Sequence, residues 1–293
     1  MVLFLMGGIM KIIKNYLTNN PCYKRNLRKT DSRDVAFQKN GPKGLMLHSV
    51  GTPQPSAKVF ISKWNKPTYT RACVHGFIDG NDGTVYQTLP WNYRGWHAGM
   101  HPRTKKTAND SLIGVEMCEP SQIRYVSGSK FVCLDKAAAA ASAKRTYQAA
   151  VELFAHLCKT YGLDPTKDGV IISHKEGHER GVASNHGDPE HLWRGLGLPY
   201  TMDIFRADVA KELKRINAPK PSKYTRYLVT AKDGVYVREE PSLSGKILGE
   251  IPYHKEVRAY DLTKTADGFV WMYCDKPTMG LKGWIKKRWL KKK

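Results

Sequence analysis

Long apolar runs are missing from this 293-residue sequence, so we expect no membrane span. Its first ten residues, MVLFLMGGIM, are apolar but short, and no basic residue precedes them as in a signal peptide. We therefore expect a protein made without a clear export signal. The sequence leaves open whether Met1 or Met10 is the true start.

The sequence also has few cysteines and few acidic residues. Its six cysteines form no C-x-x-C pair, which excludes a zinc knuckle and argues against a disulfide framework. Lys and Arg number 48 against 26 Asp and Glu, and the net charge of +22 attracts polyanions such as nucleic acid or a wall that carries teichoic acid. No zinc-finger spacing, RNA-binding motif or glycine-rich phosphate loop is present, so we expect no specific nucleic-acid partner.

Short apolar runs alternate with helical stretches between residues 44 and 216, which predicts an α/β domain. Residues 1–43 are expected to form a basic, irregular N-terminal arm packed on this domain. The expected strands lie at residues 44–48, 72–79, 83–89, 112–117 and 169–174, and the expected helices at residues 56–65, 135–161 and 202–216.

A smaller second domain is expected after a linker at residues 217–224, where two prolines stand among polar residues. From residue 225 to residue 293, brief alternating segments are separated by turn residues such as Asp233-Gly234 and Asp267-Gly268. This pattern is typical of a small all-β barrel.

Two apolar strands end in a histidine, LMLHS at His48 and VIISH at His174. Because ligands of open α/β sheets bind beyond the carboxyl ends of strands, both imidazoles are candidates for one zinc site. The spacing alone leaves open that they only pack or form hydrogen bonds. A third ligand would come from the loop after His174, which offers His178, His186, Asp188 and His191.

Five ordered blocks carry a resemblance to a known family. They are LHS (47–49), HGFIDGNDGTVYQTLPW (75–91), RGWHAG (94–99), IGVEM (113–117) and SHKEGHERGVASNHGDPEHLW (173–193). From about Lys43 to Arg206 the chain resembles the zinc-dependent N-acetylmuramoyl-L-alanine amidases, which include peptidoglycan-recognition proteins and phage endolysins. The likeness is greatest to clostridial phage and prophage enzymes, and it implies a mixed central sheet with flanking helices.

The resemblance implies roles for individual residues. The family's zinc ligands fall on His48, His174 and Asp188, and its general base falls on Glu116. His186 stands where many members have a lysine that stabilises the oxyanion, and an imidazole N–H donates a similar hydrogen bond.

Three further residues are predicted substrate contacts: His75, His97 and Trp96. For the two histidines the alternative is a structural role, and for the tryptophan it is burial in the core.

The C-terminal segment resembles a bacterial SH3-like wall-binding domain, in VYVREEPSLSGKILGEI (235–251) and GWIKKRWL (283–290). Its aromatic residues Tyr236, Trp271 and Trp284 are candidates for a peptide or polyanion groove.

These resemblances imply an enzyme that hydrolyses the amide bond between the lactyl group of N-acetylmuramic acid and the L-alanine of the peptidoglycan stem peptide. It would be made in a bacterial cytoplasm and act at the cell wall, with teichoic acid as a further partner of its basic surface. The alternatives are a recognition protein that binds without cutting and a bacterial autolysin rather than a phage endolysin. Non-catalytic relatives tend to lose a zinc ligand, whereas His48, His174 and Asp188 are all present.

Overall fold

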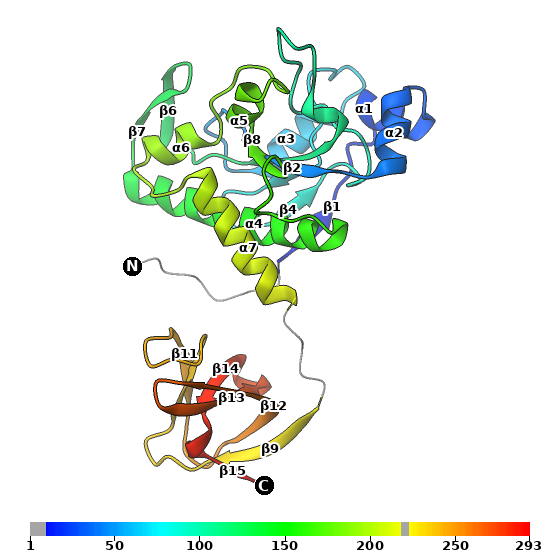
Figure 1. The fold of residues 1–293 in the computed structure, drawn as a ribbon. Coiled ribbons are helices and arrows are strands. Elements are labelled where there is room, and N and C mark those ends of the chain that lie inside the picture. Colours follow the sequence, from blue (N-terminus) through cyan, green and yellow to red (C-terminus); the bar gives the residue numbers. More distant parts are fainter. Residues whose placement is uncertain (1–9, 218–222) are drawn as a thin grey trace. The chain divides into compact units, whose positions relative to one another are not determined.

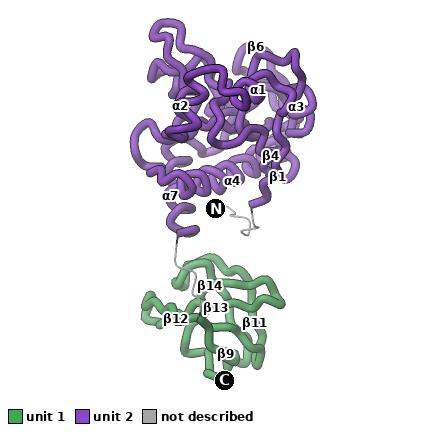
Figure 2. Tube along the Cα trace, turned by 90° about the vertical axis from the view of Figure 1, so that its right-hand side faces the viewer, with its two compact units in different colours: residues 1–7, 218–293 green, residues 8–217 purple. Residues whose placement is uncertain are grey.

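The computed structural model describes residues 10–217 and 223–293, which belong to two separate compact units (Figures 1 and 2). Most of the expected linker, residues 217–224, lies outside the described residues, as does the segment that bears on the choice between Met1 and Met10. Among the described helices, none is both long and apolar enough to cross a membrane.

The first unit is built on a six-stranded sheet. In spatial order its strands are β1 (Ile12–Lys14), β4 (Val85–Gln87), β3 (Gly76–Ile78), β5 (Leu112–Met117), β2 (Gly44–Ser49) and β8 (Ile171–Ser173). The strand β2 runs parallel to both of its neighbours, whereas β3 and β4 are antiparallel. The expected mixed sheet is therefore confirmed.

Helices cover both faces of this sheet. They are α1 (Pro21–Arg28), α2 (Ser32–Asn40), α3 (Ala57–Trp64), α4 (Lys136–Tyr161), α5 (His174–Glu179), α6 (Glu190–Gly195) and α7 (Met202–Asn217), with a short 3-10 helix η1 at Ala108–Asp110. The helix α4 is capped at its N-terminus by Asp135, whose side chain accepts a hydrogen bond from the Ala138 N–H, and at its C-terminus by Gly162, with φ of 64°. This confirms the longest helix expected from the sequence.

Strand alternation assigns the two faces of the sheet. Leu47 and Val115 lie in the core that the sheet forms with α4 and α7, which pack side by side (Figure 1). The next residues, His48 and Glu116, are register partners on β2 and β5 and face the opposite side. A polar site can therefore lie on one face without disturbing the apolar core on the other.

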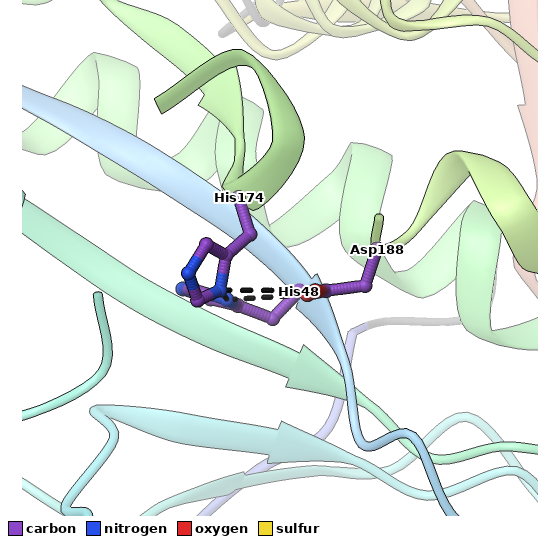
Figure 3. Close-up of side chains that lie close together, drawn as sticks. All are labelled: His48, His174 and Asp188. Atoms are coloured by element: carbon purple, nitrogen blue, oxygen red, sulfur yellow. Dashed lines mark hydrogen bonds and ion pairs between the residues drawn. The ribbon is translucent and has the colours of Figure 1, made fainter. Parts of the chain in front are cut away.

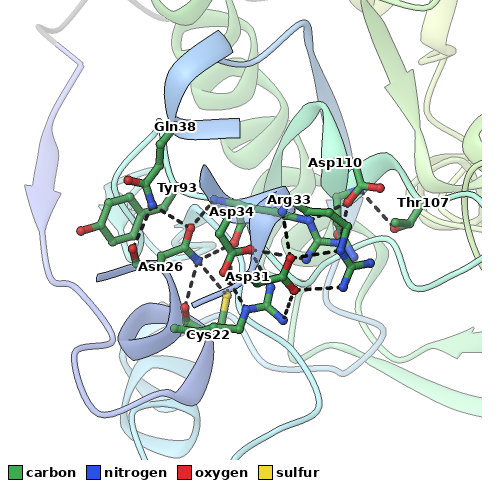
Figure 4. A network of polar contacts seen from close by, with 12 residues as sticks. Cys22, Asn26, Asp31, Arg33, Asp34, Gln38, Tyr93, Thr107 and Asp110 are labelled. Atoms are coloured by element: carbon green, nitrogen blue, oxygen red, sulfur yellow. Dashed lines mark hydrogen bonds and ion pairs between the residues drawn. The ribbon is translucent and has the colours of Figure 1, made fainter. Parts of the chain in front are cut away.

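The expected irregular arm is instead largely structured. It contains α1 and α2, and β1 extends the sheet by pairing with β4. The two helices have few apolar residues, and polar contacts fix them: the buried Asn26 bonds both backbone groups of Arg94 at 2.8 and 2.9 Å (Figure 4). Sequence periodicity could not show this, because the stabilising partners lie about 70 residues away.

Two further features differ from the expected elements. A hairpin of β6 (Ile123–Ser127) and β7 (Lys130–Cys133) precedes α4 and was not predicted. The segment after β8, expected as a loop, begins directly with α5 and later forms α6. Both helices have only six residues, too short to give a periodic pattern.

The second unit is a seven-stranded antiparallel sheet, as expected for an all-β domain. In spatial order it has β11 (Ile247–Ile251), β10 (Val235–Arg238), β14 (Leu281–Lys286), β13 (Phe269–Lys276), β12 (Glu256–Ala266), β9 (Tyr224–Val229) and β15 (Leu290–Lys292), with 3-10 helices η2 (Pro277–Met279) and η3 (Lys287–Trp289). Of the three aromatic residues proposed for a groove, Trp271 and Trp284 are buried and Tyr236 is 53% exposed. The two tryptophans are thus packing residues, because both lie on central strands.

Candidate metal centre and catalytic cleft

The structure brings His48, His174 and Asp188 together (Figure 3). One ligand atom from each lies within 4.8 Å of the others, and all three residues are buried. The Nδ1 atoms of the two histidines are 3.0 Å apart, and the Asp188 oxygens lie 3.3 Å from His48 Nδ1 and 3.7 Å from His174 Nδ1. Two nitrogens and a carboxylate oxygen form a donor set that suits zinc.

Neighbouring elements hold these residues in place. His48 is near the end of β2, and His174 is the first residue of α5, directly after β8, which pairs with β2. The Ser173 side chain caps α5 by accepting a hydrogen bond from the Glu176 N–H at 3.0 Å. The Lys175 N–H bonds the Asp188 carbonyl at 3.3 Å, which ties the start of α5 to the third residue of the centre.

A chain of hydrogen bonds decides which His48 nitrogen carries hydrogen. His97 Nε2 lies 3.1 Å from the Leu112 carbonyl, which only accepts, so His97 Nε2 is the donor. Burial holds the pKa of His97 well below its ordinary value, so the ring is neutral and its Nδ1 accepts. His48 Nε2, 3.0 Å from that atom, therefore donates. In the neutral ring this leaves a lone pair on His48 Nδ1, directed into the centre.

His174 is oriented in the same way. Its Nε2 lies 3.2 Å from the Ser184 hydroxyl and 3.1 Å from His186 Nδ1. Burial lowers the pKa of His174 to about 3, so the ring is neutral and its Nδ1 also carries a lone pair when Nε2 donates. When both rings are neutral, their Nδ1 lone pairs face each other across 3.0 Å, and a proton or a metal ion between them removes the repulsion.

The acidic groups favour that cation. Burial acts to raise the pKa of Asp188, but the hydrogen bond with His48 and the nearby histidines outweigh it and hold the pKa at about 2. Burial acts to lower the pKa of His48, and here Asp188 and Glu116 outweigh it and raise the pKa. The centre thus attracts one positive charge at His48 Nδ1, and a proton and a metal ion would compete for this place.

Glu116 stands beside this centre as the register partner of His48. Its Oε2 atom is buried and has no hydrogen-bond partner among the described residues. Burial above all raises the pKa of Glu116 to about 7. Asp188 and Glu119 contribute to this rise, and His48 acts in the opposite direction. A carboxylate with this affinity for a proton suits acid-base catalysis near neutral pH.

A cleft of about 890 Å³ opens over the centre. It is lined by the three candidate ligands and Glu116, by the aromatic residues Phe60, Trp64, Tyr69 and Trp96, and by His97, His186 and His191. His186 is exposed at its rim, next to His174. The cleft therefore joins polar reacting groups to aromatic walls of the kind on which sugars stack.

The three predicted substrate contacts lie in different places. Trp96 is half-buried and lines the cleft, and His97 lines it while holding His48. His75 is fully buried outside the cleft lining, where its Nε2 donates to the Tyr93 carbonyl at 2.7 Å and its Nδ1 accepts from the Gly114 N–H at 3.0 Å. With both nitrogens bonded to backbone, His75 holds strands together and has no polar atom left for substrate.

Two other histidines of the loop lie apart from the three converging ligands. His178 Nδ1 bonds the Ala183 carbonyl at 3.2 Å, and His191 Nε2 bonds the Tyr125 hydroxyl at 2.6 Å. They order the loop, as expected of histidines that are not ligands.

One polar network behind the cleft was missed by the sequence reasoning. The fully buried Glu119 accepts hydrogen bonds from the Tyr125 hydroxyl at 2.7 Å and from the Gly51 N–H at 3.1 Å. Because Tyr125 also bonds His191, this network connects the loop after β2 with the helix after Asp188. Tyr125 lies on the unpredicted hairpin, and residues 123–126, Ile-Arg-Tyr-Val, do not alternate regularly, so no local pattern marked it.

Comparisons with known proteins bear on this site. Among solved structures, the chain is similar to a Staphylococcus aureus hydrolase, AmiA, in complex with its ligand, with 22% identity, a TM-score of 0.50, and coverage of 72% of this chain and 88% of that one. It also matches the N-acetylmuramoyl-L-alanine amidase LysC from Clostridium intestinale URNW, with 18% identity, a TM-score of 0.33, and coverage of 64% and 98%.

The first of these similarities supports the fold of the first unit. Among curated proteins, none matches the sequence. The family assignment comes from the sequence profile: residues 38–191, more than half of the chain, match the family described as N-acetylmuramoyl-L-alanine amidase, and the chain therefore belongs to that amidase family.

Proposed function

We propose that this protein is a zinc-dependent amidase that hydrolyses the bond between the lactyl group of N-acetylmuramic acid and the L-alanine of the stem peptide. The observation that carries this proposal is the convergence of His48 Nδ1, His174 Nδ1 and the Asp188 carboxylate, in a cleft that also holds Glu116. Three protein ligands leave one position of a tetrahedral metal for water or substrate, as in catalytic zinc sites.

His48, His174 and Asp188 would hold the ion. Bound there, Zn²⁺ would polarise the scissile carbonyl and increase the acidity of the attacking water. Glu116 takes the proton of that water and passes it to the departing alanine nitrogen, for which its pKa of about 7 is suited.

His186 is the proposed oxyanion donor. When its Nδ1 accepts the hydrogen bond from His174 Nε2 at 3.1 Å, its hydrogen is on Nε2. That N–H, on an exposed ring at the rim of the cleft, would donate to the carbonyl oxygen as negative charge develops. Trp96 would contact a sugar or peptide group along the cleft wall.

The test is to incubate the purified protein with Gram-positive cell walls and to follow new N-terminal alanine. We expect alanine amines to appear, to disappear with a chelator and to return with Zn²⁺. New reducing sugar ends without alanine amines would show a glycosidase instead, and wall binding without any cleavage would show a non-catalytic recognition protein.

Asp188→Ala should remove activity and zinc content together. Asp188→Asn is the matched variant, because it keeps the shape of the side chain and loses its charge. Retained zinc in Asp188→Ala would show that another residue, such as His178 or His186, completes the ligand set in its place.

We further propose that residues 225–293 form an SH3-like domain that binds the cell wall, with teichoic acid as a second ligand of the basic surface. The net charge of +22 and the exposed Tyr236 support this. Removal of residues 219–293 should weaken binding to walls and leave zinc content unchanged. Equal binding without this segment would contradict the targeting role. If the full-length protein binds normal walls but not walls without teichoic acid, the polyanion is the ligand.

The whole protein is proposed to act as a phage-type endolysin, made in a bacterial cytoplasm and active at the wall. Expression in a Gram-positive host separates this proposal from a bacterial autolysin. An endolysin should lyse cells only when a membrane lesion is supplied, whereas an autolysin should reach the wall unaided.

A further inference from the structure

A second pocket shares the Trp96 side chain with the cleft. It has a volume of about 390 Å³, and Trp96 lines both hollows. Its other walls include Lys24, Arg25 and Arg28 of α1, together with Pro67. The segment 63–71 also borders both hollows, since Pro67 lines the pocket and Lys63 and Arg71 line the cleft.

The lining of this pocket contains three cations and no carboxylate. Arg25 is a fixed part of the wall: its Nε and Nη2 lie 2.6 and 2.7 Å from the fully buried Asp34 carboxylate, and its guanidinium lies 4.9 Å from the centre of the Trp96 ring. In contrast, neither Lys24 nor Arg28 has an ion-pair partner among the residues that the structure describes. The pocket therefore presents two cations without ion-pair partners, Lys24 and Arg28, beside an aromatic wall.

The network in Figure 4 includes Asn26 of α1, which ties this helix to the segment that precedes Trp96. Asn26 holds the backbone of Arg94, two residues before Trp96, and its amide also bonds the Cys22 carbonyl at 2.9 Å. The cations of α1 are thus carried on a helix that is anchored to the loop of Trp96. Anchored cations lose less conformational freedom when they bind an anion.

We propose that this pocket binds a carboxylate of the stem peptide, an inference that rests on the proposed amidase function. The lactyl carboxyl group forms the scissile amide and is therefore uncharged. The sugar side of the bond carries no charge at this point. The peptide side carries the carboxylates: its C-terminus, and the α-carboxylate of any γ-linked glutamate. A substrate in the cleft therefore has its negative charge on the peptide side, and the cationic pocket next to Trp96 is complementary to it.

The experiment uses the full chain and soluble N-acetylmuramoyl-L-alanyl-γ-D-glutamyl-L-lysine, with its two carboxylates free or amidated. We compare kcat/KM of the wild type with that of the double variant Lys24→Ala/Arg28→Ala. Loss of two charged contacts should reduce kcat/KM for the free-carboxylate form about tenfold, and the preference for that form over the amidated one should fall toward unity. The charge-retaining variant Lys24→Arg/Arg28→Lys should keep most of this preference.

The matched control is Lys39→Ala/Lys58→Ala, which removes the same charge from exposed positions that line neither hollow. It should keep the wild-type preference. An equal loss on both substrate forms, or no loss on either, would overturn the proposal. The proposal would also be overturned if a glycerol-phosphate polymer inhibited the wild type while the double variant kept the wild-type preference for free carboxylates. That result would identify a phosphate site.

Failure of the proposed function has a different signature. If the wild type cleaves neither substrate, equilibrium binding of the free peptide L-alanyl-γ-D-glutamyl-L-lysine still tests the pocket. Binding that the Lys24→Ala/Arg28→Ala variant weakens about tenfold would then support the pocket without the amidase activity, and equal binding by both proteins would refute it.

Discussion

His48 donates a hydrogen bond from Nε2 to His97 Nδ1 across 3.0 Å, and this contact turns the other His48 nitrogen toward Asp188. The backbone of β5 leaves space for the His97 ring. A Cβ atom at Gly114 would overlap the His97 ring, so glycine on β5 is required for the approach. His97, predicted as a substrate contact, thus also acts as a positioning residue for the candidate metal centre.

Replacing His97 tests this role. His97→Leu removes the acceptor for His48 Nε2–H, and zinc affinity should fall about 10- to 100-fold, as for other residues that orient a metal ligand. His97→Asn is the matched variant, because its side-chain oxygen can replace Nδ1 as acceptor, and it should retain more affinity. Competition with a zinc-binding dye measures both, and equal affinity in all three proteins would contradict the positioning role.

Glu116 predicts the pH dependence of activity. A general base works when deprotonated, and the pKa of Glu116 without metal is about 7, so kcat/KM should rise with pH through a midpoint at or below about 7. A zinc ion nearby would move this midpoint down. Glu116→Gln should lose about 100-fold or more in kcat and keep its zinc. Near-wild-type activity in this variant would assign the proton transfer to another group.

His75 predicts a loss of stability in mild acid. Burial lowers its pKa to about 4 in the folded chain, against an ordinary value of about 6.5, so the unfolded chain binds the proton more tightly. Its stabilising contribution is complete above pH of about 6.5 and is lost as the pH falls toward 4, by about 3 kcal/mol in total. Denaturant unfolding of the metal-free protein at several pH values measures this loss.

The comparison for this prediction is a pair of variants. His75→Gln should be less stable at neutral pH and lose less further stability between pH of about 6.5 and 4. His156→Gln, at an exposed position of α4, should follow the wild-type curve. If His75→Gln loses as much unfolding free energy as the wild type when the pH falls, the acid sensitivity comes from other groups.

Tyr125 should stabilise the walls of the cleft. Tyr125→Phe leaves the buried Glu119 and His191 without their shared partner, which should reduce the free energy of unfolding by about 1–3 kcal/mol. Since His191 follows Asp188 by three residues, zinc affinity should fall as well. Tyr161→Phe is the control, because its hydroxyl has no hydrogen-bond partner among the described residues. Unchanged unfolding and zinc affinity in Tyr125→Phe would show that the network has no such role.

The sequence determined the main elements of the first unit because their signals are local. Apolar runs ending in His48 and His174 predicted two strands that finish at the same edge of a sheet, and both do so. The helix predicted at residues 135–161 from its apolar spacing and its glycine stop is present at residues 136–161. Asp188 was a different case, because only the family resemblance distinguished it from three neighbouring histidines.

The tertiary structure decided what depends on partners far along the chain. The tautomer of His48 depends on His97, which depends in turn on the Leu112 carbonyl, and none of these is adjacent in sequence. Burial by distant elements raises the pKa of Glu116. Polar contacts between separate segments also fix α1 and α2 and form the cationic pocket. Such contacts leave no periodic pattern in the chain, so the sequence did not predict them.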